Sequence, residues 1–170
     1  MKIEDDFLNQ SEFDKLQTLM MSADEFPWFY LDGIDYETDI DKFQFIHIFY
    51  DSGAPQSAFM KQLYSILNLV DPISILRIKA NLLTRTPNIV ENTFHVDLAS
   101  WKFPPEKIKL TTTSIFYMNT NNGYTKFEDG TKVESVANRM LTFPSNMKHT
   151  GTSCTDKKIR VVINFNYFGA

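Results

Sequence analysis

The stretch that decides the fold is "KKIRVVINFNYF", residues 157–168, in which side chains of two kinds alternate. One face, from position 161 to position 167, holds only Val, Ile, Phe and Tyr. The other face carries a cation and two amides, in the order Arg160, Val162, Asn164 and Asn166. Alternation with a period of two is typical of a β-strand with two different surroundings. The apolar face predicts a core, and the second face is either exposed to water or lines a polar cavity.

Several shorter β-rich runs, separated by turn residues, precede this strand. They lie at 43–51, 73–83, 111–120, 124–136 and 138–144. The run at 124–136 contains Asp129-Gly130, a strong signal for a hairpin turn, so it divides into two strands. With the strand at 157–168, the sequence predicts about eight strands.

Two helices are predicted in the N-terminal part. The first follows Ser11, which stands three residues before Asp14 in a variant of the capping box. The second is predicted over 55–70, with Pro55 in its first turn and Asp71-Pro72 as its stop. Helices followed by many antiparallel strands indicate an α+β, mainly β domain in which the helices cover one face of a β-sandwich or barrel.

Length and composition predict one domain that folds by itself, over residues 1–170. The chain has 170 residues, 43% of them hydrophobic, which is enough for one substantial core. No run of eighteen apolar residues occurs and the first ten residues are acidic and polar, so we expect no membrane span, no signal peptide and a cytoplasmic location. Cys154 is the only cysteine, which excludes an intrachain disulfide and a multi-cysteine zinc site.

Charge is unevenly distributed along the chain. Residues 1–52 hold thirteen acidic residues against three basic ones, whereas the remainder holds eight against fourteen. A positive second part suits an anionic small molecule or a nucleic acid. A nucleic acid is the less favoured partner, because the excess is modest, no basic run is longer than two and the pI is near 5.3.

Three histidines are available for chemistry, and they differ in context. His47 lies among aromatic residues in a predicted strand, which favours a structural role. His95 and Asp97, in "NTFHVDLAS", stand two apart, so in a strand they present an imidazole and a carboxylate to one point. His149 follows a predicted strand and a proline-containing turn. Two histidines and one carboxylate form the facial triad preferred by non-heme Fe(II), and eleven residues later Arg160 offers a guanidinium that fits a carboxylate.

The ordered set of "HVD" (95–97), "FPSNMKHTG" (143–151) and "RVVINFNYF" (160–168) resembles the Fe(II)- and 2-oxoglutarate-dependent dioxygenases, in particular the prolyl 4-hydroxylase-like branch. The resemblance covers about residues 73–168. It implies a double-stranded β-helix of the jelly-roll or cupin-like type over 73–168, supported by the helices and strand of 1–72 packed on one sheet.

The resemblance also implies roles for individual residues. His95, Asp97 and His149 correspond to the ligands of Fe(II), and Arg160 corresponds to the residue that binds the distal carboxylate of 2-oxoglutarate. Tyr117 matches a tyrosine whose hydroxyl assists that carboxylate in some relatives, although it is equally consistent with a core tyrosine. Thr125 falls where a small or apolar residue contacts the co-substrate.

Further residues are candidates for the wall of the cavity. Lys79 and Asn81 share a predicted strand face with Arg77, and Asn164 and Asn166 share one with Arg160. Residues 98–110, which include Trp101, form a long connection after Asp97 and are predicted to be a lid or substrate wall, or simply a packed surface loop.

The activity implied by the resemblance is hydroxylation of a C–H bond with O2, in which 2-oxoglutarate is converted to succinate and CO2. Halogenating relatives lack the carboxylate that Asp97 supplies, which favours hydroxylation. The branch favours a protein or peptide residue such as proline as substrate, and a free amino acid or small metabolite is the alternative. A non-catalytic, metal-binding β-barrel module is the rival function, and Arg160 argues against it because a structural metal site does not need a carboxylate anchor.

Overall fold

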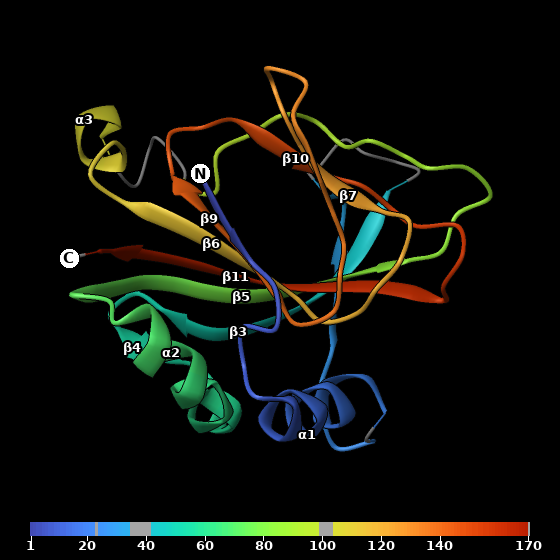
Figure 1. Ribbon diagram of the computed structural model, residues 1–170, viewed down its shortest axis with the longest axis horizontal. Helices are drawn as coiled ribbons and strands as arrows, with labels where there is room; N and C mark the ends of the chain where they lie inside the picture. The colour runs from blue at the N-terminus through green and yellow to red at the C-terminus, as the bar shows by residue number, and fades with distance from the viewer. Residues whose placement is uncertain (23, 35–41, 99–103, 170) are drawn as a thin grey trace.

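The computed structural model describes residues 1–22, 24–34, 42–98 and 104–169, and they form a mainly β structure (Figure 1). In chain order the elements are β1 (Lys2–Glu4), α1 (Gln10–Met21), β2 (Phe29–Asp32), β3 (Phe43–Asp51), β4 (Ala54–Pro55), η1 (Ala58–Leu63), α2 (Tyr64–Val70), β5 (Ser74–Thr84), α3 (Pro105–Ile108), β6 (Thr112–Tyr117), β7 (Tyr124–Phe127), β8 (Lys132–Glu134), β9 (Arg139–Pro144), β10 (His149–Gly151) and β11 (Ile159–Phe168).

Within the described residues the strands form two antiparallel sheets. The larger sheet has the order β1-β9-β6-β11-β5-β3-β2, with β4 paired to β3 as its eighth strand, and the smaller sheet has the order β10-β7-β8. The C-terminal strand β11 lies at the centre of the larger sheet, between β5 and β6. The smaller sheet lies over one face of the larger one (Figure 1). This arrangement confirms the predicted jelly-roll fold.

The two faces of β11 belong to two different packing layers, as the alternation predicted. Val161, Ile163 and Phe165 are buried in the core that the larger sheet forms with the helices. Val162 packs in a second apolar cluster with residues of β6, β7, β8 and β9, between the two sheets. The polar face of β11 therefore points towards the smaller sheet and is not exposed to water.

The helices α1 and α2 cover the face of the larger sheet opposite the smaller sheet (Figure 1). The predicted apolar stripe of the first helix, Phe13, Leu16 and Met20, is buried in this layer, where Phe13 packs edge-on against Phe116 of β6. The helices thus support the sheet from outside and leave its inner face available for a site.

The starts of both predicted helices needed correction. The first helix begins at Gln10, and its N-cap is Asn9, whose side chain accepts a hydrogen bond from the backbone N–H of Glu12. Ser11 therefore lies inside the helix. The second begins with the 3-10 turn η1, capped by Ser57, because Pro55 is held in β4 by pairing with Tyr50.

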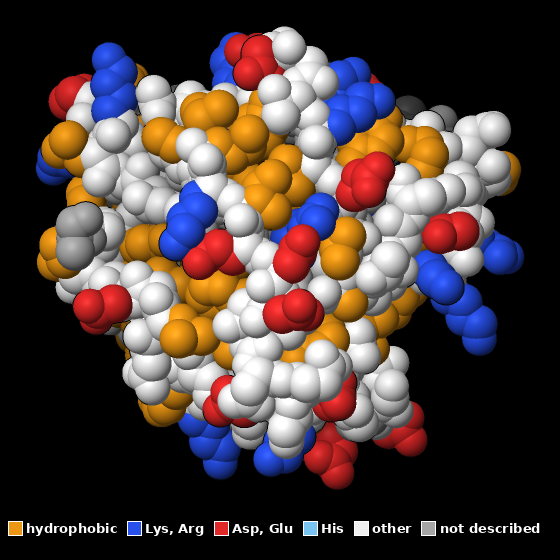
Figure 2. Space-filling model, in the orientation of Figure 1, with side chains coloured by type: hydrophobic (Ala, Val, Ile, Leu, Met, Phe, Trp, Pro, Cys, Tyr) orange, Lys and Arg blue, Asp and Glu red, His pale blue; other side chains and the backbone are white. Residues whose placement is uncertain are grey.

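The end of the second helix is as predicted, since Asp71 takes a left-handed conformation with φ of 47° as its C-cap. None of the helices in the described part of the chain combines the length and apolar character needed to span a bilayer; the longest, α1, has 12 residues. On the face drawn in Figure 2, acidic and basic side chains are interspersed, and Lys and Arg do not gather into a stripe.

His95-Val96-Asp97 does not form the regular strand through which the two side chains were expected to meet. The only β-pairing at this point is an isolated bridge between His95 and His149. The chain from 85 to 98 instead crosses from the larger sheet to the smaller one, where it pairs through two isolated bridges, Glu91 with Thr152 and His95 with His149. Among the described residues, the sequence also gave no signal for β1, β2, β4 and β10, each of which has four residues or fewer.

Candidate active site

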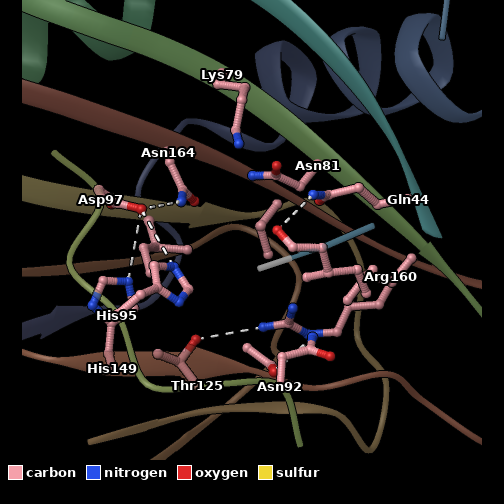
Figure 3. Close-up of a pocket in the computed structure, with 15 residues that line it drawn as sticks. Gln44, Lys79, Asn81, Asn92, His95, Asp97, Thr125, His149, Arg160 and Asn164 are labelled. Carbon is pink, nitrogen blue, oxygen red and sulfur yellow. Dashed lines mark hydrogen bonds and ion pairs between the residues drawn. The ribbon is translucent and has the colours of Figure 1, made fainter. Parts of the chain in front are cut away.

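Three side chains with metal-ligating atoms converge at one end of the space between the two sheets (Figure 3). They are His95, Asp97 and His149, and one ligand atom from each lies within 4.8 Å of the others. The Nε2 atoms of both histidines are 3.9 Å from the same oxygen of Asp97, Oδ1. The structure therefore brings together the residues that the sequence predicted as a facial triad.

Backbone hydrogen bonds hold the two histidines opposite each other. The N–H of His95 donates to the carbonyl of His149 at 3.0 Å, and the N–H of His149 donates back to the carbonyl of His95 at 3.0 Å. In an antiparallel bridge of this kind the two side chains point to the same side, and the ring centroids are 5.2 Å apart. One reciprocal bridge thus places the two imidazoles on the same side of the chain.

The orientation of each ring is fixed by its second nitrogen. Nδ1 of His95 lies 2.9 Å from the carbonyl of Thr93, and Nδ1 of His149 lies 3.2 Å from the carbonyl of Met147. A carbonyl can only accept, so Nδ1 carries the proton in both rings and the lone pair belongs to Nε2. This is the tautomer in which imidazoles bind a metal through Nε2.

The carboxylate of Asp97 is buried and receives hydrogen bonds on both oxygens. Asn164 donates to Oδ1 at 3.3 Å, and Asn166 donates to Oδ2 at 3.1 Å. The guanidinium of Arg77 lies 3.6 Å from Oδ1 and also donates to the side-chain carbonyl of Asn166 at 3.2 Å. Asn166 is thus a positioning residue behind Asp97 and is not part of the cavity wall.

The surroundings set the charge of these groups. Burial raises the pKa of the Asp97 carboxyl, but His149, Arg77, His95 and the amide of Asn166 outweigh burial and hold that pKa below its ordinary value. Burial lowers the pKa of His149 from its ordinary value, against the opposing effect of Asp97. At neutral pH the site therefore holds an ionised carboxylate and a neutral His149, as metal coordination requires.

Arg160 occupies the other end of the same cavity and is only 4% exposed. Its Nε donates to the hydroxyl of Ser135 at 2.8 Å, and its Nη2 lies 3.4 Å from the hydroxyl of Thr125. Thr125 in turn accepts from the hydroxyl of Tyr117 at 2.7 Å. No described residue offers Arg160 a carboxylate within ion-pair distance, so its charge is buried without a counter-ion from these parts of the chain.

Gly123 allows the stem of Arg160 to pass close to the backbone. A Cβ at position 123 would lie 2.7 Å from Cδ of Arg160 and 2.7 Å from the carbonyl of Ser153. Any other residue would therefore displace the guanidinium or the neighbouring strand connection.

No protein-family model matches the sequence, and no curated protein matches it. The non-heme α-ketoglutarate-dependent epimerase SnoN from nogalamycin biosynthesis superposes with a TM-score of 0.68 at 12% identity, over 99% of this chain and 78% of that one. A prolyl hydroxylase from Trichoplax adhaerens, solved with a hypoxia inducible factor peptide fragment, gives a TM-score of 0.65 at 14% identity, over 99% of this chain and 83% of that one.

HygX from Streptomyces hygroscopicus, solved with nickel, 2-oxoglutarate and hygromycin B, gives a TM-score of 0.61 at 8% identity over 99% and 82% of the two chains. All three are similar along nearly the whole chain. The fold is that of the 2-oxoglutarate-dependent oxygenases.

Within this oxygenase fold, the cavity measures about 590 Å³ with its open mouth included. Its wall contains most of the predicted site residues, which are Lys79, Asn81, His95, Asp97, Thr125, His149, Arg160 and Asn164. Tyr117 is fully buried behind Thr125 and reaches the site through that residue. Burial, together with the adjacent Arg77, lowers the pKa of Lys79 to about 8, while Asp97 acts in the opposite direction.

Several residues of the site were missed by sequence reasoning. Gln44 and Asn92 line the cavity, and Ser135 holds Arg160. Gln44 is on the same face of the sheet as Asn81, because Ile46 pairs with Asn81 across β3 and β5. The alternation of the strand at 43–51 contained that signal. Asn92 and Ser135 lie outside regular strands, where no periodicity identifies the direction of a side chain.

His47 has the structural role that its context favoured. Its ring is 3% exposed, and its nitrogens lie 2.8 Å from the carbonyl of Pro27 and 2.7 Å from the hydroxyl of Ser57. The predicted lid at 98–110 remains a prediction, because Trp101 and the rest of 99–103 lie outside the described residues. The described part of that connection contains α3, where Ile108 is buried.

Proposed function

We propose that this protein is a 2-oxoglutarate- and Fe(II)-dependent oxygenase that hydroxylates a C–H bond. The observation that carries the proposal is the buried Arg160, which lacks an acidic partner among the described residues and faces the same cavity as the His95, Asp97 and His149 cluster. A buried guanidinium without a counter-ion is costly unless a ligand supplies the negative charge. A dicarboxylate that reaches from Arg160 to a metal satisfies both ends.

The residues fit Fe(II) by their chemistry. Two imidazoles and one ionised carboxylate form a donor set that leaves coordination positions open, which is the pattern of non-heme Fe(II) oxygenases. When bound, the iron supplies the redox chemistry that couples the conversion of 2-oxoglutarate and O2 into succinate and CO2 to hydroxylation of the substrate.

The protein's own residues provide binding and orientation. Arg160 binds the distal carboxylate of 2-oxoglutarate, and Thr125 fixes the guanidinium with the support of Tyr117. Asn164 and Asn166 hold the Asp97 carboxylate in one orientation. The apolar residues Ile115, Val162 and Leu83 in the cavity wall limit the access of water.

We propose two classes of substrate for this site. A residue of a protein or peptide, with proline favoured by the resemblance, and a free amino acid or small metabolite are both compatible with the fold. Among proteins of similar structure, one was solved with a peptide fragment and another with hygromycin B.

The test is the visible charge-transfer band that an Fe(II)–2-oxoglutarate chelate gives under anaerobic conditions. We expect the band in the wild-type protein and its loss in His149→Ala. Arg160→Ala removes charge-assisted hydrogen bonds that contribute about 1.5–3 kcal/mol, so 2-oxoglutarate affinity should fall roughly 10- to 100-fold.

The matched control is Arg139→Ala, which removes an arginine paired with Asp5 outside the cavity and should leave the band unchanged. Fe(II) or Mn(II) affinity measured without 2-oxoglutarate should be similar in Arg160→Ala and the wild type. If the wild-type protein binds metal but gives no band, the protein is instead a metal-binding β-barrel module.

A further inference from the structure

A second cation, distinct from Arg160, faces the cavity beside the metal-ligand cluster. Lys79 projects from β5 into the space next to Asn164 (Figure 3), and these two residues are direct neighbours across β5 and β11. The Lys79 amine forms no hydrogen bond and no ion pair with any described residue. Lys79 is also half-buried, so water satisfies its charge only in part.

The position of Lys79 separates it from the Arg160 end of the cavity. Asn164, the neighbour of Lys79, is four residues from Arg160 on β11. At a rise of about 3.3 Å per residue, the Cα atoms of Asn164 and Arg160 are roughly 13 Å apart along the strand. Lys79 also lines a second opening at the ligand cluster, together with Arg77, His95 and Asp97. Arg160 and Thr125 do not line that opening. The cationic residues that line this opening are Arg77 and Lys79.

The balance of charge at the site is positive. The described walls of the two openings hold Arg77, Lys79 and Arg160 against a single carboxylate, Asp97. A divalent metal and the doubly negative 2-oxoglutarate add no net charge, so the excess remains once both are bound. Since Arg77 is already engaged with Asp97, Lys79 is the cation that is available to a second ligand.

An unsatisfied acceptor lies next to this cation. The amide nitrogen of Asn164 must face Asp97, because a carboxylate can only accept, so its carbonyl oxygen Oδ1 points away from Asp97. This oxygen is buried and accepts no hydrogen bond from a described residue. A ligand at Lys79 is therefore offered one positive charge and one neighbouring hydrogen-bond acceptor.

We propose that the substrate of the site is an anion, whose carboxylate binds Lys79 and whose adjacent N–H or O–H group donates to Asn164. This inference rests on the proposed oxygenase function and adds the chemical class of the substrate. It favours a free acid or an acidic residue over a neutral peptide segment.

The experiment uses the protein loaded anaerobically with Fe(II) and 2-oxoglutarate. The probes are the N-acetyl-L-amino acids and their matched carboxamides, which differ only in the charge of the α-carboxyl group and retain an N–H next to it. N-acetyl-L-aspartic acid 1-amide is included to separate a side-chain carboxylate from an α-carboxylate. Binding is measured by ligand-detected NMR and by the shift of the charge-transfer band, and succinate formation is measured after O2 is admitted.

We expect at least one acid to bind while its carboxamide does not. Lys79→Gln should weaken binding of that acid by roughly tenfold or more, because it removes a charge-assisted hydrogen bond, whereas Lys79→Arg should retain most of it. The affinity for 2-oxoglutarate should change less than about twofold in both variants, since the co-substrate depends on Arg160. Lys61→Gln, on η1 and outside the cavity, is the matched control.

Three results overturn the inference. Carboxamides that bind as well as the acids exclude recognition of charge, and a panel in which no acid binds excludes this class of substrate. An equal loss of 2-oxoglutarate affinity in Lys79→Gln assigns the lysine to the co-substrate. All three are read in protein that shows the charge-transfer band, so they differ from failure of the oxygenase function, in which the band itself is absent.

Discussion

Asp97 illustrates how single residues determine the chemistry of the site. One of its oxygens faces both histidines, and the other is held by Asn166, which also contacts Arg77 and the hydroxyl of Thr113. This network keeps the carboxylate ionised and prevents it from rotating. The amides are neutral, so they orient the charge without cancelling it.

Replacing Asn166 with Ala should weaken metal binding by about 10- to 100-fold, the usual effect of losing an outer hydrogen bond to a ligand. The side chain touches Asp97 but not the cavity, so the cause is loss of orientation. Titration with Mn(II) or Co(II) measures the effect. Asn92→Ala, which changes an amide of the cavity wall that does not contact Asp97, is the control. Equal affinity in Asn166→Ala and the wild type would show that Asp97 needs no such support.

At the scale of elements, the start of α1 shows how tertiary contacts decide between two possible N-cap residues. Both Asn9 and Ser11 are residues that cap helices, and the sequence pattern favoured Ser11 with Asp14. In the structure, Asn9 and Glu12 bond to each other in both directions, and Glu12 also accepts from Ser65 of α2. Asn9 is therefore the N-cap, and its partner Glu12 also links α1 to α2.

Asn9→Ala should lower the free energy of unfolding by about 1 kcal/mol, whereas Ser11→Ala should change it by less than about 0.5 kcal/mol. Ser11 is exposed, and its hydroxyl makes no hydrogen bond to a described residue. Urea unfolding of the two variants in parallel gives the comparison. The opposite order would place the cap at Ser11.

At the scale of the whole molecule, two buried histidines in different layers link stability to pH. Burial lowers the pKa of His149, in the site, and of His47, on β3 against Ser57 and Phe59, from their ordinary value of 6.5. The unfolded chain therefore binds protons at a higher pH than the folded chain does. The stability contributed by the neutral rings is fully present above about pH 6.5 and is lost as the pH falls below it.

Metal-free protein should accordingly unfold at progressively lower urea concentration as the pH is lowered from 7.5 to 5.5. His47→Gln should flatten part of this dependence without touching the metal ligands, and metal affinity at pH 7.5 should be unchanged. A pH profile identical to that of the wild type would show that His47 titrates alike in the folded and unfolded states.

The sequence by itself determined the parts of this protein that repeat with a regular period. The two-faced strand at 160–168, the hairpin at Asp129-Gly130 and the apolar stripe of the first helix were all predicted correctly, because local alternation decides which side of an element is buried. The order of the HxD motif, the distal histidine and the arginine indicated the fold through a resemblance and identified four residues that the structure places in one cavity.

Only the tertiary structure decided how these residues meet. His95 and His149 face each other through one non-local bridge, Gln44 and Asn92 reach the cavity from separate segments, and Ser135 contacts Arg160 from a third. That neither Arg160 nor Lys79 has a carboxylate partner among the described residues is likewise a property of what surrounds each side chain. Sequence spacing reports which residue types are present, but pairing and burial depend on contacts between distant segments, and those contacts give the site its charge and its proposed ligands.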